Sequence, residues 1–275
     1  MRTDLHIHTI ASDGCWTEEQ VIAEVQARGI GLFAIADHDS VANVLPTESL
    51  ARGVGLAFMR GVEVSTLLEG SLFHVLAYGF NLGDLSFATL LRENRAKLDQ
   101  SNEDTIHYMI AAGYEIDLDD YAAYEHDRTR GGWKVLNFLI DRGFCADVGD
   151  YIRNLRAHLV TEWPLFPHPA EAVAAIREAG GVPILAHPGV SLRDEGVSEK
   201  TLHPFLDFGI SGLECYSHYH DDATTCFCLD WCNRHNLLIT GGSDCHGGFV
   251  GRELGVPAVD TADLRLGELE QRIIR

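Results

Sequence analysis

The chain is poor in positive charge. It has 21 Lys and Arg residues against 41 Asp and Glu residues, which gives a formal net charge of −20 over 275 residues. A surface of this sign repels a nucleic-acid backbone unless bound cations reverse the charge locally. We therefore expect no duplex nucleic acid among the partners of this protein.

Long hydrophobic runs are also missing. No apolar run approaches the roughly 18 residues that a membrane span requires, and no signal-peptide pattern precedes the first predicted strand. These absences predict a cytoplasmic protein with no membrane partner.

Paired cysteines of the zinc-finger or redox type are absent as well. The seven cysteines are an odd number, and none of them forms a CxxC pair, so reduced thiols are favoured over a disulfide framework. Cys226, Cys228 and Cys232 lie close together, which leaves a soft-metal site as an alternative. The spacing of four between Cys228 and Cys232 favours packing on one face of a helix instead.

Helix and strand signals alternate through most of the chain. The sequence Thr17-Glu18-Glu19-Gln20 is typical of a capping box and predicts a helix that ends at Gly29. The uniformly apolar run 31–36 predicts a strand buried on both faces. Further helices are expected near 41–52, 169–179, 199–208, 222–235 and 264–274, and strands near 57–64, 72–80, 182–186, 212–215 and 237–240. Repeated βα units indicate an α/β fold with a parallel sheet, closed as a barrel or wound open.

Strand signals vanish over residues 84–166. One long helix or two short ones are expected over 85–112, with shorter helices near 117–126, 132–141 and 147–155. We predict that residues 84–166 form a helical insertion domain that caps the active site, while residues 1–83 and 167–275 form the barrel.

Residues suited to metal binding recur where the predicted strands end. His6 and His8 are two apart on the first strand, so their side chains share one face about 6.6 Å apart, and Leu5 and Ile7 predict a core on the other face. The others are Asp37, His38, Glu63, His74, His187, Asp244 and His246. Because nine such groups at one barrel mouth would repel one another and resist desolvation, they predict bound cations.

The chain resembles the PHP superfamily, named for its polymerase and histidinol-phosphatase members. The matching motifs are His6-Ile7-His8, Ser12-Asp13-Gly14, Asp37-His38-Asp39, Gly61-Val62-Glu63, Ala186-His187-Pro188 and the run from Gly242 to Gly247. This resemblance implies a distorted (β/α)7 barrel.

Residues 179–188 are similar to the TrpH-like branch, whose members are metal-dependent phosphoesterases with a helical insertion after the fourth strand. The chain departs from that branch at Arg130-Gly131-Gly132-Trp133, where many members have Arg-Pro-His.

The resemblance implies three metal positions. The first would be held by His6, His8, Glu63 and Asp244; the second by Glu63 as a bridge with His74 and His187; the third by Asp13, His38 and His246. Mixed nitrogen and oxygen ligands without a cysteine suit two to three divalent ions of manganese, iron or zinc.

The expected chemistry is phosphate ester hydrolysis. Two ions about 3.5–4 Å apart lower the pKa of a shared water, so we predict that a metal-bridging hydroxide attacks phosphorus and that no protein nucleophile is needed. Arg130 and Arg95 are expected to bind a substrate phosphate, because the guanidinium fork matches its oxygens. His218 or His220 is a possible general acid, and a surface loop position is equally open for each.

The first functional prediction is a phosphomonoesterase for a small nucleotide, such as a nucleoside 3′,5′-bisphosphate or AMP. The enzymatic alternatives are a 5′–3′ exonuclease on short oligonucleotides and a histidinol-phosphate phosphatase. The non-enzymatic alternative is an inactive, metal-stabilised module that binds a nucleotide. The intact set of ligand residues argues against that last alternative.

Overall fold

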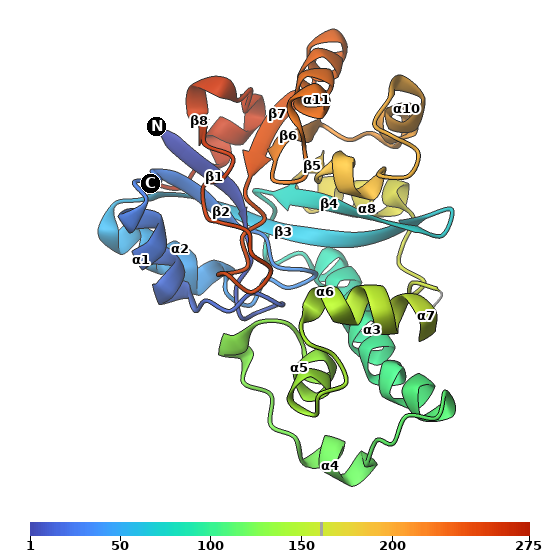
Figure 1. Cartoon of the computed structure of the whole chain (residues 1–275). Coiled ribbons are helices and arrows are strands. Elements are labelled where there is room, and N and C mark those ends of the chain that lie inside the picture. The colour runs from blue at the N-terminus through green and yellow to red at the C-terminus, as the bar shows by residue number, and fades with distance from the viewer. Residues whose placement is uncertain (160–161) are drawn as a thin grey trace.

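The computed structural model describes residues 1–159 and 162–275. One eight-stranded sheet has the strand order β7-β6-β5-β4-β3-β2-β1-β8 (Figure 1). The strands are β1 (Arg2–Ile7), β2 (Leu32–Ile35), β3 (Ala57–Leu68), β4 (Ser71–Tyr78), β5 (Val182–Leu185), β6 (Gly212–Ser217), β7 (Leu238–Gly242) and β8 (Val259–Asp260).

Helices cover the outside of the sheet and form a separate group below it (Figure 1). Those beside the sheet are α1 (Glu18–Ala27), α2 (Val44–Val54), α8 (Pro169–Glu178), α9 (Pro188–Ser191), α10 (Glu199–Phe208) and α11 (Asp222–His235). The capping box predicted at the start of α1 is confirmed, because Thr17 accepts from the Gln20 backbone and Gln20 accepts from the Thr17 backbone.

The sheet curls until its two ends meet, which makes a nearly closed, distorted barrel. The loop after β7 reaches β1, where the His8 amide donates to the Cys245 carbonyl at 2.8 Å and the Ser243 amide donates to the buried Asp4 carboxylate at 3.0 Å. The predicted barrel fold is therefore confirmed, and the carboxyl ends of β1 and β7 lie side by side.

The sheet is mixed, so the expectation of a parallel sheet is wrong for β4. This strand is antiparallel to both β3 and β5, whereas β1–β3 and β5–β7 pair in parallel. Glu69 and Gly70 alone join β3 to β4, both with positive φ, and a two-residue turn of this kind connects only antiparallel strands.

The predicted helix near 264–274 is also wrong. The 3₁₀ turn η3 (Thr261–Asp263) precedes this segment, which itself forms the 3₁₀ helix η4 (Gly267–Arg272) and pairs with the barrel through its last residues. The amides of Ile274 and Phe58 each donate to the other's carbonyl, at 2.8 and 2.9 Å. The apolar spacing suits a helix, but pairing with β3 and burial of Leu269 hold the segment extended at its end.

Alternate residues of β1 to β5 face one another inside the barrel. This inner cluster includes Leu5, Ala34, Met59, Tyr78 and Ile184. Leu5 and Ile7 are both buried as expected, but Ile7 belongs to a different cluster beneath α1 and α2, because the register of β1 shifts between Asp4 and Ile7. That shift lets Leu5 fill the inner core while His6 and His8 still face the barrel mouth.

The helices of residues 84–159 pack around a hydrophobic cluster of their own. They are α3 (Leu85–Ala111), α4 (Leu118–Ala123), α5 (Lys134–Asp141), α6 (Val148–Asp150) and α7 (Ala157–Leu159), with the 3₁₀ turn η1 (Arg128–Arg130) and the π-helix η2 (Tyr151–Arg156). Residues 85–111 form one long helix, which settles the alternative left open by the sequence. Among residues 1–159 and 162–275, no helix is long and apolar enough to cross a membrane.

Candidate metal centre

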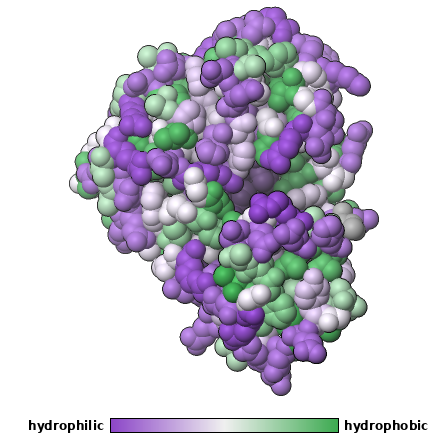
Figure 2. All heavy atoms as spheres, in the orientation of Figure 1, coloured by the Kyte–Doolittle hydropathy of each residue, from purple (hydrophilic) through white to green (hydrophobic). Residues whose placement is uncertain are grey.

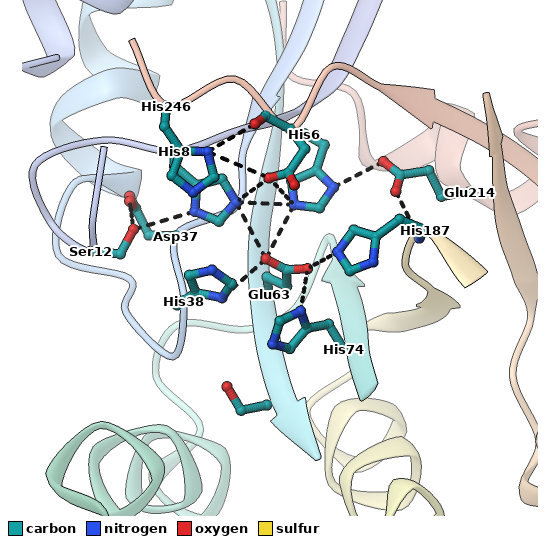
Figure 3. Close-up of polar contacts among 12 residues, drawn as sticks. His6, His8, Ser12, Asp37, His38, Glu63, His74, His187, Glu214 and His246 are labelled. Carbon is teal, nitrogen blue, oxygen red and sulfur yellow. Dashed lines mark hydrogen bonds and ion pairs between the residues drawn. The ribbon is translucent and has the colours of Figure 1, made fainter. Parts of the chain in front are cut away.

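His6 on β1, His8 directly after β1 and Glu63 on β3 form the middle of the candidate site (Figure 3). The Nε2 atoms of His6 and His8 lie 3.1 Å apart, and Glu63 Oε2 lies 3.2 and 3.3 Å from them. Asp244 Oδ1, from the loop after β7, lies 2.9 Å from His8 Nε2. Four ligand atoms from three segments therefore converge on one point at the barrel mouth, and they are able to hold one ion.

Glu63 extends this group on its other side. Its Oε1 lies 2.8 Å from His187 Nε2 and 3.1 Å from His74 Nδ1, and its Oε2 lies 3.1 Å from His38 Nδ1. One fully buried carboxylate is thus surrounded by five imidazoles. A carboxylate with two oxygens facing two groups of ligands has the arrangement of a bridge between ions.

A third group lies around Asp13 on the loop after β1. Asp13 Oδ1 is 3.3 Å from His246 Nε2 and 3.7 Å from His8 Nδ1, and Asp13 Oδ2 is 4.0 Å from His38 Nε2. These four residues form a possible ligand set, as do His6, His8, Glu63 and Asp244, and also His38, Glu63 and His74. His38 thus faces two groups, whereas His187 contacts the centre through Glu63.

Several ligand atoms have no hydrogen-bond partner among the residues that the structure describes. Asp13 Oδ1, Glu63 Oε2 and Asp244 Oδ1 are buried in this state although imidazole nitrogens lie close by. These oxygens and the nearby imidazole nitrogens are close enough to interact, but their angles are not those of hydrogen bonds. Each buried polar atom left without a partner lowers the stability of the fold by about 1–3 kcal/mol. Shared cations would satisfy these atoms together, so the residues present fit divalent metal ions.

The charges of the cluster oppose the effect of burial. Burial works to raise the pKa of Glu63, but His74, His6 and His38 outweigh it and hold that pKa well below its usual range. Burial works to lower the pKa of His8, but Asp244 and Glu63 raise it to about 10. Without metal, Glu63 is therefore negatively charged and His8 positively charged. A metal ion that binds His8 must displace the proton of its imidazole ring.

Two ligands sit on strained backbone. His187 has φ of 23° and Asp244 has φ of 52°, a region that costs a non-glycine residue of order 1–3 kcal/mol. Both residues directly follow short segments at strand ends, where the left-handed conformation turns the side chain back toward the barrel mouth. The surrounding contacts hold these two side chains at the centre.

Glu214 on β6 holds His6 and the His187 segment. Its Oε1 lies 2.9 Å from His6 Nδ1, and its Oε2 accepts from the His187 amide at 2.9 Å (Figure 3). A carboxylate on the outer nitrogen fixes the ring so that Nε2 faces the metal position. Glu214 was not among the residues expected from the sequence, although a charged residue within an otherwise apolar strand is a detectable signal.

Asp37 is not at the centre, which corrects its place among the expected metal-type residues. It accepts from the Thr9 amide and hydroxyl, both at 2.7 Å, and from the Ser12 hydroxyl at 2.6 Å. All the hydrogen bonds of its side chain go to the loop after β1. Asp37 therefore shapes the loop that carries Asp13.

Arg252 and Tyr219 hold the outer oxygen of Asp244. An Nη1 atom of Arg252 and the Tyr219 hydroxyl, at 3.1 Å, both donate to Asp244 Oδ2, and the guanidinium lies 4.8 Å over the tyrosine ring. Neither residue could be expected from the sequence, because nothing in their spacing relates them to Asp244.

The two candidate general acids differ in position. His218 is exposed. His220 has both ring nitrogens engaged, with Nδ1 on the Cys215 carbonyl at 2.8 Å and Nε2 accepting from the Gly189 amide at 3.0 Å. His220 thereby fixes α9, which directly follows His187. These contacts give His220 a structural role, and an acid role for either residue stays a prediction.

An arginine-lined cavity adjoins the histidine cluster. Its volume is about 350 Å³, and Figure 2 shows a hollow between the barrel and the insertion. The lining residues are Ile10, Ala11, Ser40, Ala42, Asn43, Arg95, Asp99 and Arg128. A second cavity of about 400 Å³ continues along α3 and shares Ser40, Arg95 and Asp99 with the first. Because Ser40 is two residues from His38, the cavity lies next to the ligand loops.

Arg130 points elsewhere in this structure. Its guanidinium forms two hydrogen bonds of 2.7 Å with Asp141 and one of 3.1 Å with the Tyr124 hydroxyl. Of the two arginines expected to bind substrate, only Arg95 lines the cavity. Arg128, which was not among the arginines expected from the sequence, also lines this cavity, and a role for Arg130 stays a prediction.

Three characterised relatives span nearly the whole chain. A phosphoribosyl 1,2-cyclic phosphate 1,2-diphosphodiesterase from Eggerthella lenta is 27% identical over 90% of this chain and 95% of its own length. A 3′,5′-nucleoside bisphosphate phosphatase from Chromobacterium violaceum is 28% identical over 99% and 98%. A 5′-3′ exoribonuclease from Haemophilus influenzae is 26% identical over 88% and 89%. No family model matches the chain.

Solved structures are similar over the same extent. A Bifidobacterium adolescentis protein described as a metal-dependent phosphoesterase superposes with a TM-score of 0.85 at 26% identity, over 99% of this chain and 96% of that one. A two-domain Bacteroides vulgatus protein with a PHP-like metal-dependent phosphoesterase part gives a TM-score of 0.50 at 13% identity, over 92% and 56%, and is similar in fold alone.

Proposed function

The chain belongs to the PHP superfamily and is a metal-dependent phosphoric ester hydrolase, and from this premise we propose that it hydrolyses a phosphate monoester of a small nucleotide. The observation that carries the proposal is a cavity with two arginines in its lining, next in sequence to the loops that carry the eight clustered His, Asp and Glu side chains. The cluster would hold the phosphate that reacts, and the cavity would hold a second anionic part of the same molecule.

The cavity favours a nucleotide with a second phosphate. A volume of about 350 Å³ lies at the lower end of the range for small-molecule sites. Arg95 and Arg128 supply two guanidinium groups there, and Asn43 and Ser40 supply neutral hydrogen-bonding groups. Arg95 Nε lies 3.0 Å from the carboxylate of Asp99, which also lines the cavity, so a bound phosphate would compete with Asp99 for this arginine. A nucleoside 3′,5′-bisphosphate carries two separated phosphates that would match the cluster and the arginines, whereas AMP would use the arginines only weakly.

We assign the ligands to three positions. His6, His8, Glu63 and Asp244 would hold one ion, Glu63 with His74 and His187 a second, and Asp13, His38 and His246 a third, with His8 close to the last group. Divalent ions bound there would lower the pKa of a water and offset the charge of the phosphoryl group. Manganese, iron and zinc all suit this donor set.

The chain's own residues prepare the site for that chemistry. Glu214 fixes the His6 ring, while Arg252 and Tyr219 leave only one oxygen of Asp244 facing the centre. We expect no protein nucleophile, so the reaction should invert the configuration at phosphorus. Retention of configuration would contradict direct attack by water.

The experiment is a hydrolysis assay with a substrate panel, in which released phosphate is measured for the monoesters and the cleavage products are separated by chromatography for the diesters. The panel is adenosine 3′,5′-bisphosphate, AMP, a trinucleotide, a cyclic phosphate and histidinol phosphate, each with manganese and with excess chelator. We expect the fastest chelator-sensitive release from the bisphosphate. The Glu63→Gln variant should be inactive, and the exposed Glu195→Gln variant serves as its control. Faster turnover of the trinucleotide would assign the exonuclease activity instead, and no turnover by the manganese-loaded protein would favour a nucleotide-binding module.

A further inference from the structure

One barrel side chain belongs to the hydrophobic cluster of the insertion. The buried members of this cluster all lie between Ile106 and Leu155, and Phe249 packs against them from the loop after β7. Phe249 is three residues beyond His246, a ligand of the candidate metal centre. The loop that carries this ligand is therefore fastened to the insertion by an aromatic ring.

The ring rests on a turn made of two glycines. Gly131 and Gly132 have φ of 75° and 74°, and a Cβ atom on them would come within 2.6 Å of Phe249 Cγ and 2.8 Å of Phe249 Cζ, respectively. Neither a side chain nor an ordinary backbone conformation fits at this turn. The glycine pair allows the ring to lie directly against the backbone of the insertion.

The same turn contacts the loop of a second ligand. The Gly132 amide donates to the Asp13 carbonyl at 2.8 Å, and the Cys15 amide donates to the His246 carbonyl at 3.1 Å. The Asp13 and His246 loops are thus joined to each other and to the insertion. Their side chains meet in the ligand group of His8, Asp13, His38 and His246, with Asp13 Oδ1 3.3 Å from His246 Nε2.

We propose that Phe249 and the Gly131-Gly132 turn couple the seating of the insertion to metal binding by Asp13, His38 and His246. An ion at this position fixes the Asp13 and His246 loops, and these loops hold the insertion over the arginine-lined cavity through the ring and the Gly132 amide. Loss of the Phe249 ring frees the ligand loops from the insertion, so that the metal ion is held less tightly and the insertion opens more often. Phe249 is a positioning residue in this proposal, which rests on the proposed function only in requiring that the cluster binds divalent ions.

The test compares Phe249→Ala with the conservative Phe249→Leu and with Tyr108→Ala, which removes an exposed ring from the insertion. Manganese binding is measured by calorimetric titration, and hydrogen exchange of residues 106–155 is followed with and without manganese. In the wild type, manganese should slow this exchange. In Phe249→Ala, one manganese site should lose tenfold or more in affinity and the slowing should disappear, while the other sites stay filled. Phe249→Leu should retain most of both properties, and Tyr108→Ala should retain them fully.

A second variant covers a failure of Phe249→Ala to fold. Gly132→Ala keeps the ring but pushes it from the turn, and it should produce the same two losses. Wild-type manganese affinity and wild-type protection in either folded variant would overturn the coupling, as would an insertion whose exchange manganese does not change. A wild type that binds manganese and protects its insertion, but hydrolyses no member of the substrate panel, would overturn the proposed function and leave the coupling intact.

Discussion

The Asn94 carboxamide donates to the Asp39 carboxylate at 2.9 Å, across the joint between the insertion and the barrel. The same Nδ2 atom donates to the Ser65 carbonyl at 2.9 Å, and the Ser65 amide donates to Asp39 at 3.1 Å. Asn94 lies in the middle of α3 and is only 1% exposed. Because Asp39 follows the ligand His38 and Ser65 lies two residues after Glu63, this contact anchors α3 beside the metal centre.

Replacing Asn94 by Ala should destabilise the protein by about 1–3 kcal/mol, because the buried Asp39 carboxylate and Ser65 carbonyl would each lose a donor. Burial already raises the pKa of Asp39, and the Asn94 amide works against that rise. Urea unfolding measures the change, and Glu93→Ala, exposed on the same helix, is the control. Equal unfolding midpoints for the two variants would contradict an anchoring role.

The convergence of these side chains could be predicted from sequence because it depends on local position. His6, His8 and Asp244 lie at the ends of apolar runs, and strand ends meet at one rim in any parallel βα arrangement. The supporting contacts could not be predicted in this way. Glu214 reaches His6 only because β7 meets β1 where the barrel closes, which places β6 two strands from β1. Arg252 reaches Asp244 only because the loop after β7 folds back on itself.

The errors in the fold have a similar cause. Residues 264–274 have apolar spacing that suits a helix, yet pairing between Phe58 and Ile274 decides their conformation. Asn94 stands in a polar stretch of α3, yet its side chain is buried against Ser65 and Asp39 of the barrel. Long-range contacts override local preference at both places. The direction of β4 follows from the two-residue turn Glu69-Gly70, which connects only antiparallel strands, and from β3 and β4 extending further toward each other than their apolar runs predict.

Replacing Glu214 by Gln should weaken metal binding about 10- to 100-fold, as is usual for a lost partner of a metal-binding histidine. The glutamine amide would turn a donor toward either the His6 Nδ1–H or the His187 amide, where the carboxylate now accepts at 2.9 Å from both sides. Competition between the protein and a manganese chelator measures the affinity. Glu195→Gln is the matched control, and an unchanged affinity in Glu214→Gln would contradict this role.

Metal binding near neutral pH should release protons. Without metal, the pKa of His8 is raised to about 10 by Asp244 and Glu63. The attraction between the charged His8 ring and these carboxylates therefore stabilises the fold fully below about pH 6.5, the pKa of an unperturbed histidine. This stabilisation is lost as the pH rises toward 10. A metal ion needs the neutral ring, so each displaced proton should increase the apparent affinity by up to about tenfold per pH unit between pH 7 and 8.5. Titration calorimetry at pH 7 in two buffers of different ionisation enthalpy measures the release. Equal heats in both buffers would contradict it.

Arg128 and Arg130 are two residues apart but should differ in their effect on catalysis. Arg128 faces the cavity, whereas Arg130 is held by two 2.7 Å hydrogen bonds to Asp141 and would have to break them to reach a substrate. A hydrogen bond to a charged group contributes about 1.5–3 kcal/mol, so Arg128→Ala should lower kcat/KM for a nucleoside 3′,5′-bisphosphate by roughly 10- to 150-fold, mainly through KM.

The same substitution should change turnover of a small aryl phosphate little, because that substrate has no second phosphate to place in the cavity. Arg130→Ala should affect both substrates weakly. Arg142→Ala, which breaks another arginine–aspartate pair on the insertion, controls for the loss of such a pair. Steady-state kinetics of the three variants with both substrates decide between the arginines. A large loss in Arg130→Ala with none in Arg128→Ala would show that Arg130 leaves Asp141 to bind the second phosphate, as the sequence motif predicts.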